Sequence, residues 1–210
     1  MKFFKRDAAP PADRIVPFWT WWASQRDRIA AAIATGTVAS LAGEISAQVH
    51  RVDPKLAWEL APGHTAKHSL IVTPEGNPEV RPSSVAWLAA APPADAVWEY
   101  YASRQPGPLA SLVIAGATLD LKDVRAIAAW NESREVVNVS LWHPGFASLP
   151  PAVPKQVAFL FLDSLLGEDD VERWIGSIEV LGADTGGRTP DELRDEVARR
   201  AATATVLRIG

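Results

Sequence analysis

Tryptophan content is the feature that most constrains how this chain can fold. The 210 residues include nine tryptophans and no cysteine. The tryptophans occur along the whole chain: Trp19, Trp21, Trp22, Trp58, Trp87, Trp98, Trp130, Trp142 and Trp174. If each of them buries about 150–250 Å², together they remove about 1,400–2,200 Å² from water. A chain of this length with that much aromatic surface can form a core without disulfides or a structural metal.

Composition excludes several classes of protein. A chain without cysteine has no disulfides, thiol nucleophiles or thiolate metal ligands, and it fits a reducing compartment. The basic start, Met1–Arg6, is followed by Asp7 and prolines rather than by an apolar run, so we expect neither a signal peptide nor a membrane anchor. The net charge of −4 argues against a general nucleic-acid binder. We therefore expect a soluble cytoplasmic protein with no membrane or nucleic-acid partner.

Helical periodicity begins near Pro17, so residues 1–16 are predicted to be a flexible arm. Apolar residues then recur at near-helical spacing until Gly36, which is a suitable stop. Thr37 is predicted to cap a second helix that ends before Asp53. Further helices are predicted over residues 84–91, 153–166, 169–175 and 189–202. The helix over 153–166 is apolar almost all round, which is typical of a helix in the interior, with Val157, Leu160, Phe161 and Leu165 in the core.

Period-two patterns predict strands over residues 56–61, 67–73, 97–104, 112–119, 136–142 and 178–181. Residues 123–130 also have helical propensity, but the polar turn at 131–134 favours a hairpin with 136–142. Because most strands follow one another through short turns, we expect a largely antiparallel mixed sheet with helices packed mainly on one face. The predicted class is α+β, and residues 17–210 are predicted to form a single domain.

Several stretches together resemble a family of uncharacterised bacterial proteins, a domain of unknown function. They are Pro17–Trp22, Thr73–Asn77, Ala90–Pro92 with Trp98–Tyr100, Trp142–Pro144 and Leu166–Glu172, which include an FWxWW start, a PEGN loop and an LGEDDVE segment. The resemblance covers roughly residues 17–181. It implies a bacterial origin and a single domain, and it carries over no activity, cofactor or catalytic residue.

The histidines give weak evidence for a metal or a catalytic site. His64 and His68 are four residues apart, but the expected strand would separate them by about 13 Å, too far for one ion. His143 lies at a strand end, where Asp123 or Asp163 could orient it. A serine triad would need an exposed serine on a sharp turn, and the chain has no G-x-S-x-G motif. We predict no metal site and no cofactor.

The densest acidic cluster lies between residues 163 and 172. A divalent cation or a general acid–base pair is one interpretation. The other is that Asp169 and Glu172 form a capping box, with the neighbouring acids complementing the helix dipole. Capping is the simpler explanation.

Successive side chains of a strand point to opposite faces of the sheet, and the face opposite the apolar residues is a candidate binding face. If the predicted strands lie in one sheet with their apolar residues on the same face, polar and aromatic side chains gather on the other face: Glu59, Glu99, Tyr101, Arg125, Asn138 and Trp142. Such a face suits a small polar ligand or a protein partner, although it also fits a solvated face or one covered by the arm. We expect a non-enzymatic binding domain, and a homo-oligomer is possible. The alternative is a small hydrolase-like or metal-assisted enzyme that uses residues 163–172 or His143.

Overall fold

The computed structural model describes residues 12–207 and has two compact units, which divide after Arg104. Each unit has its own hydrophobic core, and the first unit contains one sheet and the second contains two. The predicted α+β class is confirmed, with strands that are mostly antiparallel. The prediction treats residues 17–210 as one domain, and the described chain instead builds two separate cores. The three sheets therefore replace the single sheet that the phase argument assumed.

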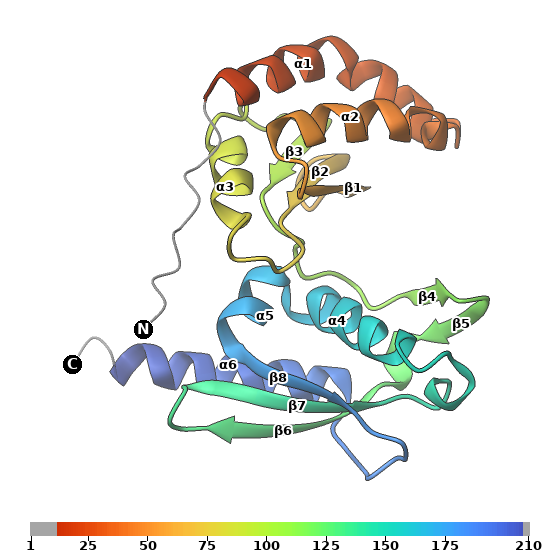
Figure 1. Ribbon diagram of the computed structural model, residues 1–210, viewed down its shortest axis with the longest axis vertical. Coiled ribbons are helices and arrows are strands. Elements are labelled where there is room, and N and C mark those ends of the chain that lie inside the picture. Colours follow the sequence, from red (N-terminus) through yellow and green to blue (C-terminus); the bar gives the residue numbers. More distant parts are fainter. Residues whose placement is uncertain (1–11, 208–210) are drawn as a thin grey trace. The chain divides into compact units, whose positions relative to one another are not determined.

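The first unit contains three strands and three α-helices in its described part (Figure 1). The elements are α1 Ala12–Ala34, a 3-10 turn Val38–Leu41, α2 Ala42–Val52, β1 Ala57–Pro62, β2 His68–Thr73, α3 Arg81–Ala89 and β3 Trp98–Tyr101. β1 pairs with β2 antiparallel, as predicted, and β2 pairs with β3 parallel. The long connection through α3 provides the crossover that a parallel pair requires.

Aromatic side chains fill the core of this unit. Trp22, Trp87 and Trp98 are fully buried, and Trp22 meets Trp98 edge to face, with ring centroids 4.9 Å apart. The indole N–H of Trp22 donates to the Tyr100 hydroxyl at 3.1 Å, which attaches α1 to β3. Trp58 is only half-buried at the margin of this core, where its indole donates to Ser46 Oγ at 2.8 Å. Tryptophan therefore anchors this core as the sequence predicts.

Two predictions near the first helix are corrected. α1 begins at Ala12, so residues 12–16 of the predicted arm are helical, and the rest of the arm lies outside the described residues. Ile15 is buried and extends the apolar stripe of Phe18 and Trp22 by one turn, which explains the earlier start. Thr37 makes no side-chain capping bond. A 3-10 turn precedes α2, so this threonine is not at the start of the α-helix.

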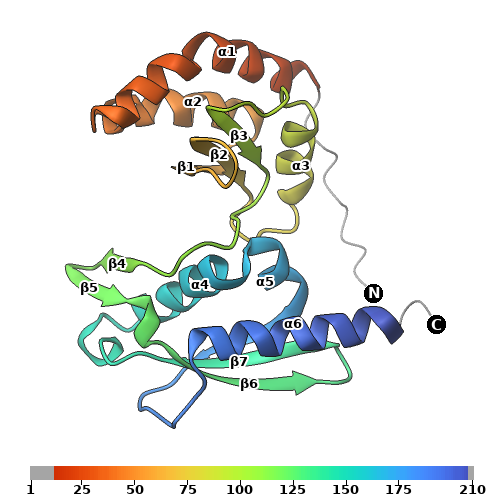
Figure 2. The ribbon, with the colours of Figure 1, turned by 180° about the vertical axis from the view of Figure 1, so that it is seen from behind.

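The second unit contains two sheets and three α-helices in its described part. The elements are β4 Ser111–Ile114, β5 Ala117–Asp120, a 3-10 turn Leu121–Asp123, β6 Arg125–Asn131, β7 Val136–Trp142, a 3-10 turn Phe146–Ser148, α4 Val153–Leu166, α5 Glu168–Trp174, β8 Ile175–Val180 and α6 Pro190–Leu207. The helices lie on one face of the β6-β7-β8 sheet, which Figures 1 and 2 show from opposite sides.

The predicted hairpin over residues 123–142 is confirmed, because β6 and β7 pair antiparallel from Arg125 opposite Trp142 to Asn131 opposite Val136. The predicted single strand over 112–119 is instead the hairpin β4–β5. Its turn residues, Ala115 and Gly116, have positive φ angles of 50° and 77°. Tight hairpin turns require this conformation, and the glycine accommodates it without strain.

α4 packs one face on the core instead of being buried all round. Val157, Phe161 and Leu165 have no exposed surface, as predicted. Leu160 is only half-buried, and Phe159 is 45% exposed. The prediction that Leu160 lies in the core was therefore wrong. Apolar residues on the outer face of α4 hide the stripe that would otherwise distinguish a surface helix.

Candidate functional site

The six predicted binding residues belong to two different sheets. Glu59 lies in β1, and Glu99 and Tyr101 lie in β3. The other three residues, Arg125, Asn138 and Trp142, lie in β6 and β7 of the second unit. The strands that carry these residues do not all share a sheet, so the six residues do not form one face.

In the second unit, Arg125, Asn138 and Trp142 lie on the face opposite the core, as their phase predicts. The Arg125 guanidinium donates to the main-chain carbonyls of Lys122 and Val124, at 3.2 and 2.9 Å. Trp142 is half-buried and lines a small apolar pocket of about 170 Å³ with Phe146, Ala147, Pro154, Val180, Leu181 and Gly182. This pocket has no charged residue in its lining, so it offers little to a polar ligand.

In the first unit, Glu59 has a structural role. Its carboxylate accepts from Arg104 Nε at 2.5 Å, and the same guanidinium reaches Glu75 at 3.3 Å. The arginine therefore links β1 to the loop after β2. A carboxylate held in this way is less available to a ligand.

Glu99 is a charged residue whose carboxylate is buried and held mainly by main-chain donors. Its side chain is 4% exposed. One carboxylate oxygen accepts from the His64 N–H, and the other accepts from the amides of Thr65 and Ala66, at 3.0 and 3.1 Å, and from the Thr65 hydroxyl. The turn after β1 thus folds around the carboxylate of β3.

A glycine makes this arrangement possible. A Cβ atom on Gly63 would lie 2.5 Å from the Ala66 carbonyl oxygen and 2.9 Å from a Glu99 carboxylate oxygen. A Cβ atom is essentially never found this close to an oxygen atom, so any larger residue would open the turn or displace the carboxylate. The Pro62-Gly63 pair marks this site in the sequence.

The turn stabilises the charged form of Glu99. Burial alone would raise the pKa of this carboxyl, but hydrogen bonds from the Thr65 hydroxyl and the amides of His64, Thr65 and Ala66 outweigh it. The pKa falls from its ordinary value of 4.5 to about 2. Burial, and then the neighbouring Glu99 carboxylate, raise the pKa of Tyr101. The pair is therefore an ionised carboxylate beside a neutral phenol at neutral pH.

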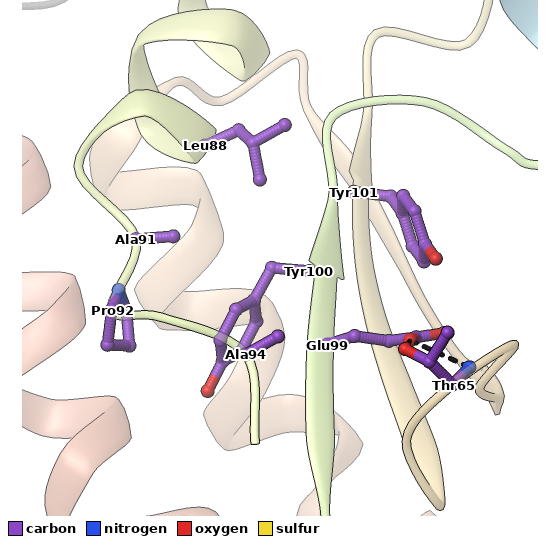
Figure 3. Close-up of a pocket in the computed structure, with 8 residues that line it drawn as sticks. All are labelled: Thr65, Leu88, Ala91, Pro92, Ala94, Glu99, Tyr100 and Tyr101. Carbon is purple, nitrogen blue, oxygen red and sulfur yellow. Dashed lines mark hydrogen bonds between the residues drawn. The ribbon is translucent and has the colours of Figure 1, made fainter. Parts of the chain in front are cut away.

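Glu99 and Tyr101 line an open trough of about 340 Å³ that runs along β3 (Figure 3). Its lining also includes Thr65, Leu88, Ala91, Pro92, Ala94 and Tyr100. In Figure 3, Tyr100 points from β3 toward the segment after α3, whereas Glu99 and Tyr101 point to the other side, toward Thr65. One side of the trough is therefore apolar, and the other carries the carboxylate.

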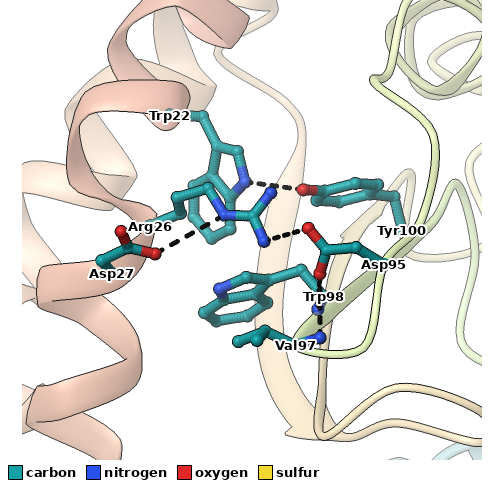
Figure 4. A network of polar contacts seen from close by, with 7 residues as sticks. All are labelled: Trp22, Arg26, Asp27, Asp95, Val97, Trp98 and Tyr100. Atoms are coloured by element: carbon teal, nitrogen blue, oxygen red, sulfur yellow. Dashed lines mark hydrogen bonds and ion pairs between the residues drawn. The ribbon is translucent and has the colours of Figure 1, made fainter.

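A polar network fixes the start of β3 and the apolar side of the trough (Figure 4). The Asp95 carboxylate accepts from the amides of Val97 and Trp98, at 2.8 and 2.9 Å, and from Arg26 of α1 at 2.5 Å. Hydrogen bonds from Trp98 and Val97, followed by that from Arg26, lower the pKa of Asp95. The hydroxyl of Tyr100 accepts from Trp22. The strand that carries the candidate residues is thus held rigidly in place.

The alternative site residues have structural surroundings. His143 is 4% exposed, its Nε2 lies 3.0 Å from the Asp120 carbonyl oxygen, and its Nδ1 accepts from the Gly145 amide at 2.9 Å. Neither Asp123 nor Asp163 orients it in this way. His68 is buried in β2, while His64 lies in the turn. Within residues 12–207, no three His, Asp or Glu side chains are placed to hold a metal ion.

The capping box predicted at Asp169 and Glu172 was wrong. α5 begins at Glu168 and its N-cap is Gly167, so Asp169 lies inside the helix and is not the N-cap residue. Gly167 is the single residue between α4 and α5 and occupies the N-cap position, where its φ of 85° is a conformation that favours glycine. A capping box does form at the start of α6: the Thr189 amide donates to Glu192 at 2.8 Å, and the Glu192 amide donates to Thr189 Oγ1 at 3.4 Å.

Sequence reasoning identified Glu99 and Tyr101 but missed the rest of the trough. The other lining residues come from separate parts of the chain, and no periodicity connects them. Thr65 lies in a turn, Leu88 lies at the end of a helix, and Tyr100 points to the other face of the sheet from Glu99. The turn residues Pro62-Gly63 were the one available indication.

No helix of the described chain has both the length and the apolar character needed to cross a membrane. Comparison of the chain with protein-family models, with curated proteins and with solved structures gives no match.

Proposed function

We propose that this protein is a non-enzymatic binding protein whose first unit takes a cationic group of its ligand into the trough beside Glu99. The ionised carboxylate of Glu99 in the trough wall is the observation that carries the proposal. Among the described residues that line the trough, it is the one charged side chain. An ammonium or guanidinium group is the chemical complement of such a site.

The neighbouring groups favour a cation further. Tyr101 places an aromatic ring next to the carboxylate, and aromatic faces attract cations at close range. The Glu99 carboxylate accepts from the turn residues His64, Thr65 and Ala66, and the Tyr101 hydroxyl is a further hydrogen-bond partner.

The apolar side of the trough favours a ligand that is not purely polar. Leu88, Ala91 and Pro92 offer hydrocarbon surface opposite the carboxylate. A volume of about 340 Å³ is near the lower end of small-ligand sites, which span about 300–1,000 Å³. A ligand of about a dozen heavy atoms, or a side chain of a larger partner, matches that size.

The arrangement gives less support to an enzyme. Histidine is the commonest general base in enzymes, but both ring nitrogens of the buried His143 are engaged with the main chain. The Glu99 carboxylate, with its low pKa, is a poor proton acceptor at neutral pH. Binding is therefore the better supported role.

The proposal is tested by amide chemical-shift titration of the whole protein with acetyl-arginine amide and with acetyl-citrulline amide. The two probes have nearly the same shape, but only the first is charged. We expect saturable shifts at Thr65, Glu99 and Tyr101 with the arginine probe, and binding at least tenfold weaker with the citrulline probe.

Two variants provide controls. Ala94→Trp should block the trough from an exposed position, whereas Ala96→Trp, also exposed but outside the lining, should leave binding unchanged. Equal affinity for the two probes, or shifts confined to the second unit, would contradict the proposal.

A further inference from the structure

The trough lies along an open strand edge. β3 is an outer strand of the β1-β2-β3 sheet, so one of its sides faces β2 and the other has no strand. The Trp98 amide donates to the Asp95 carboxylate at 2.9 Å, and the Trp98 carbonyl accepts from the Asp95 amide at 2.9 Å. The main-chain groups of Trp98 therefore point away from β2, and the Asp95 turn closes this part of the edge.

The main-chain groups of Tyr100 are left open. Along a strand, the N–H and C=O groups of successive residues point to alternate edges, so those of Tyr100 point the same way as those of Trp98. No hydrogen bond within the described residues reaches them from that side. Tyr100 itself lines the trough. One donor and one acceptor of the main chain thus face the space that a ligand would occupy.

We propose that the ligand is an extended peptide segment, which lies in the trough as a short strand beside β3 and pairs with Tyr100. This inference rests on the proposed function and specifies its partner. Strand addition of this kind takes its affinity from main-chain hydrogen bonds and its specificity from the side-chain pockets on either face.

The two sides of the trough fix the side-chain pattern of the peptide. Residues that face each other on paired strands point to the same side of the sheet. The peptide residue opposite Tyr100 therefore points to Leu88 and Ala91, and it should be apolar. Its two neighbours point to the side of Glu99 and Tyr101 and should be basic. The preferred segment alternates basic, apolar and basic side chains.

The open edge of β3 is limited at both ends, which limits the length of the added strand. The Asp95 turn blocks pairing beyond Trp98, and β3 ends at Tyr101. In the antiparallel arrangement proposed here, the central peptide residue donates its N–H to the Tyr100 carbonyl and accepts from the Tyr100 amide. A free cationic small molecule would use the Glu99 side alone, and the experiment separates these two ligands.

The test uses the whole protein and the peptide acetyl-threonine-arginine-leucine-arginine-threonine-amide, with acetyl-arginine amide as the small-molecule probe. A second peptide carries N-methylleucine, which removes the central main-chain donor but keeps every side chain. We expect the first peptide to bind at least tenfold more tightly than the small probe, and N-methylation to weaken it about tenfold, as the loss of a main-chain hydrogen bond does. The Tyr100 amide should exchange with solvent more slowly in the complex.

The outcomes separate the two proposals. If the small probe binds but the peptide binds no more tightly and N-methylation has no effect, strand addition is overturned and the cation site stands. If neither the probe nor the peptide binds, the proposed function fails as well. A third peptide, with leucine and the arginines exchanged to give leucine-arginine-leucine, checks the pattern. Equal binding of this peptide would overturn the assignment of the two sides.

Discussion

Replacing Glu99 by glutamine should destabilise the first unit by an amount that depends on pH. The carboxylate accepts hydrogen bonds from three amides and one hydroxyl in the 64–66 turn. Its pKa is about 2 in the folded chain against an ordinary value of 4.5, which corresponds to about 3 kcal/mol of stability at neutral pH. Glutamine has the same size, but its amide nitrogen cannot accept, so buried donors lose their partner.

The sign of the pH dependence follows from the lowered pKa. The contribution of Glu99 is complete above pH 4.5, where both states are ionised, and it is lost as pH falls through 4.5 toward 2. The free-energy difference between wild type and Glu99→Gln should therefore shrink by about 2 kcal/mol between pH 7 and pH 3. Urea denaturation followed by tryptophan fluorescence measures it, because six of the nine tryptophans lie before residue 105.

The pH dependence of the wild-type stability does not by itself give the contribution of Glu99, since other carboxyls, such as Asp95, also have lowered pKa values. The difference in the free energy of unfolding between wild type and Glu99→Gln does give this contribution. Exposed Glu79→Gln is the matched control and should change stability by less than about 0.5 kcal/mol at either pH. A Glu99→Gln difference that stays constant from pH 7 to pH 3 would refute the reasoning, because the ionised carboxylate would then carry no stability.

Three further predictions concern the second unit. Phe161→Ala should lower its stability by about 3–5 kcal/mol in chemical denaturation, because Phe161 is fully buried; half-buried Leu160→Ala should cost clearly less, and equal costs would contradict the packing of α4. Thr189→Ala should cost about 0.5–2 kcal/mol through loss of the capping box, and an unchanged urea midpoint would contradict that role. Gly116→Val should cost about 1–2 kcal/mol because φ is +77°, although a side chain there meets open space; a neutral thermal-melting result would contradict the turn assignment.

Local structure could be predicted from the sequence because it depends on local patterns. The β6–β7 hairpin, the capping box at Thr189 and the aromatic core of the first unit follow from periodicity, capping residues and apolar surface. Glu99 and Tyr101 could be selected because they alternate along β3 with Trp98 and Tyr100, which belong to the aromatic core. These features involve residues that are close along the chain or that obey one period.

Global arrangement could not be predicted in this way. Nothing in the phase of β1 or β7 says that Glu59 and Trp142 lie in different sheets, because strand order depends on tertiary packing. The trough joins a turn, a helix end and a strand edge that come together only in the fold. The outer face of α4 carries Phe159, so its pattern resembled a fully buried helix. In each case, long-range packing decided what local sequence left open.

The central claim is that β3 and Glu99 form a site for a basic, extended peptide. A crystal structure of the protein with the arginine-leucine-arginine peptide tests it most directly. The claim predicts that the central residue pairs with the Tyr100 main chain while one guanidinium lies within hydrogen-bond distance of the Glu99 carboxylate. A peptide bound elsewhere on the molecule, or a trough that stays empty at saturating peptide, would contradict it.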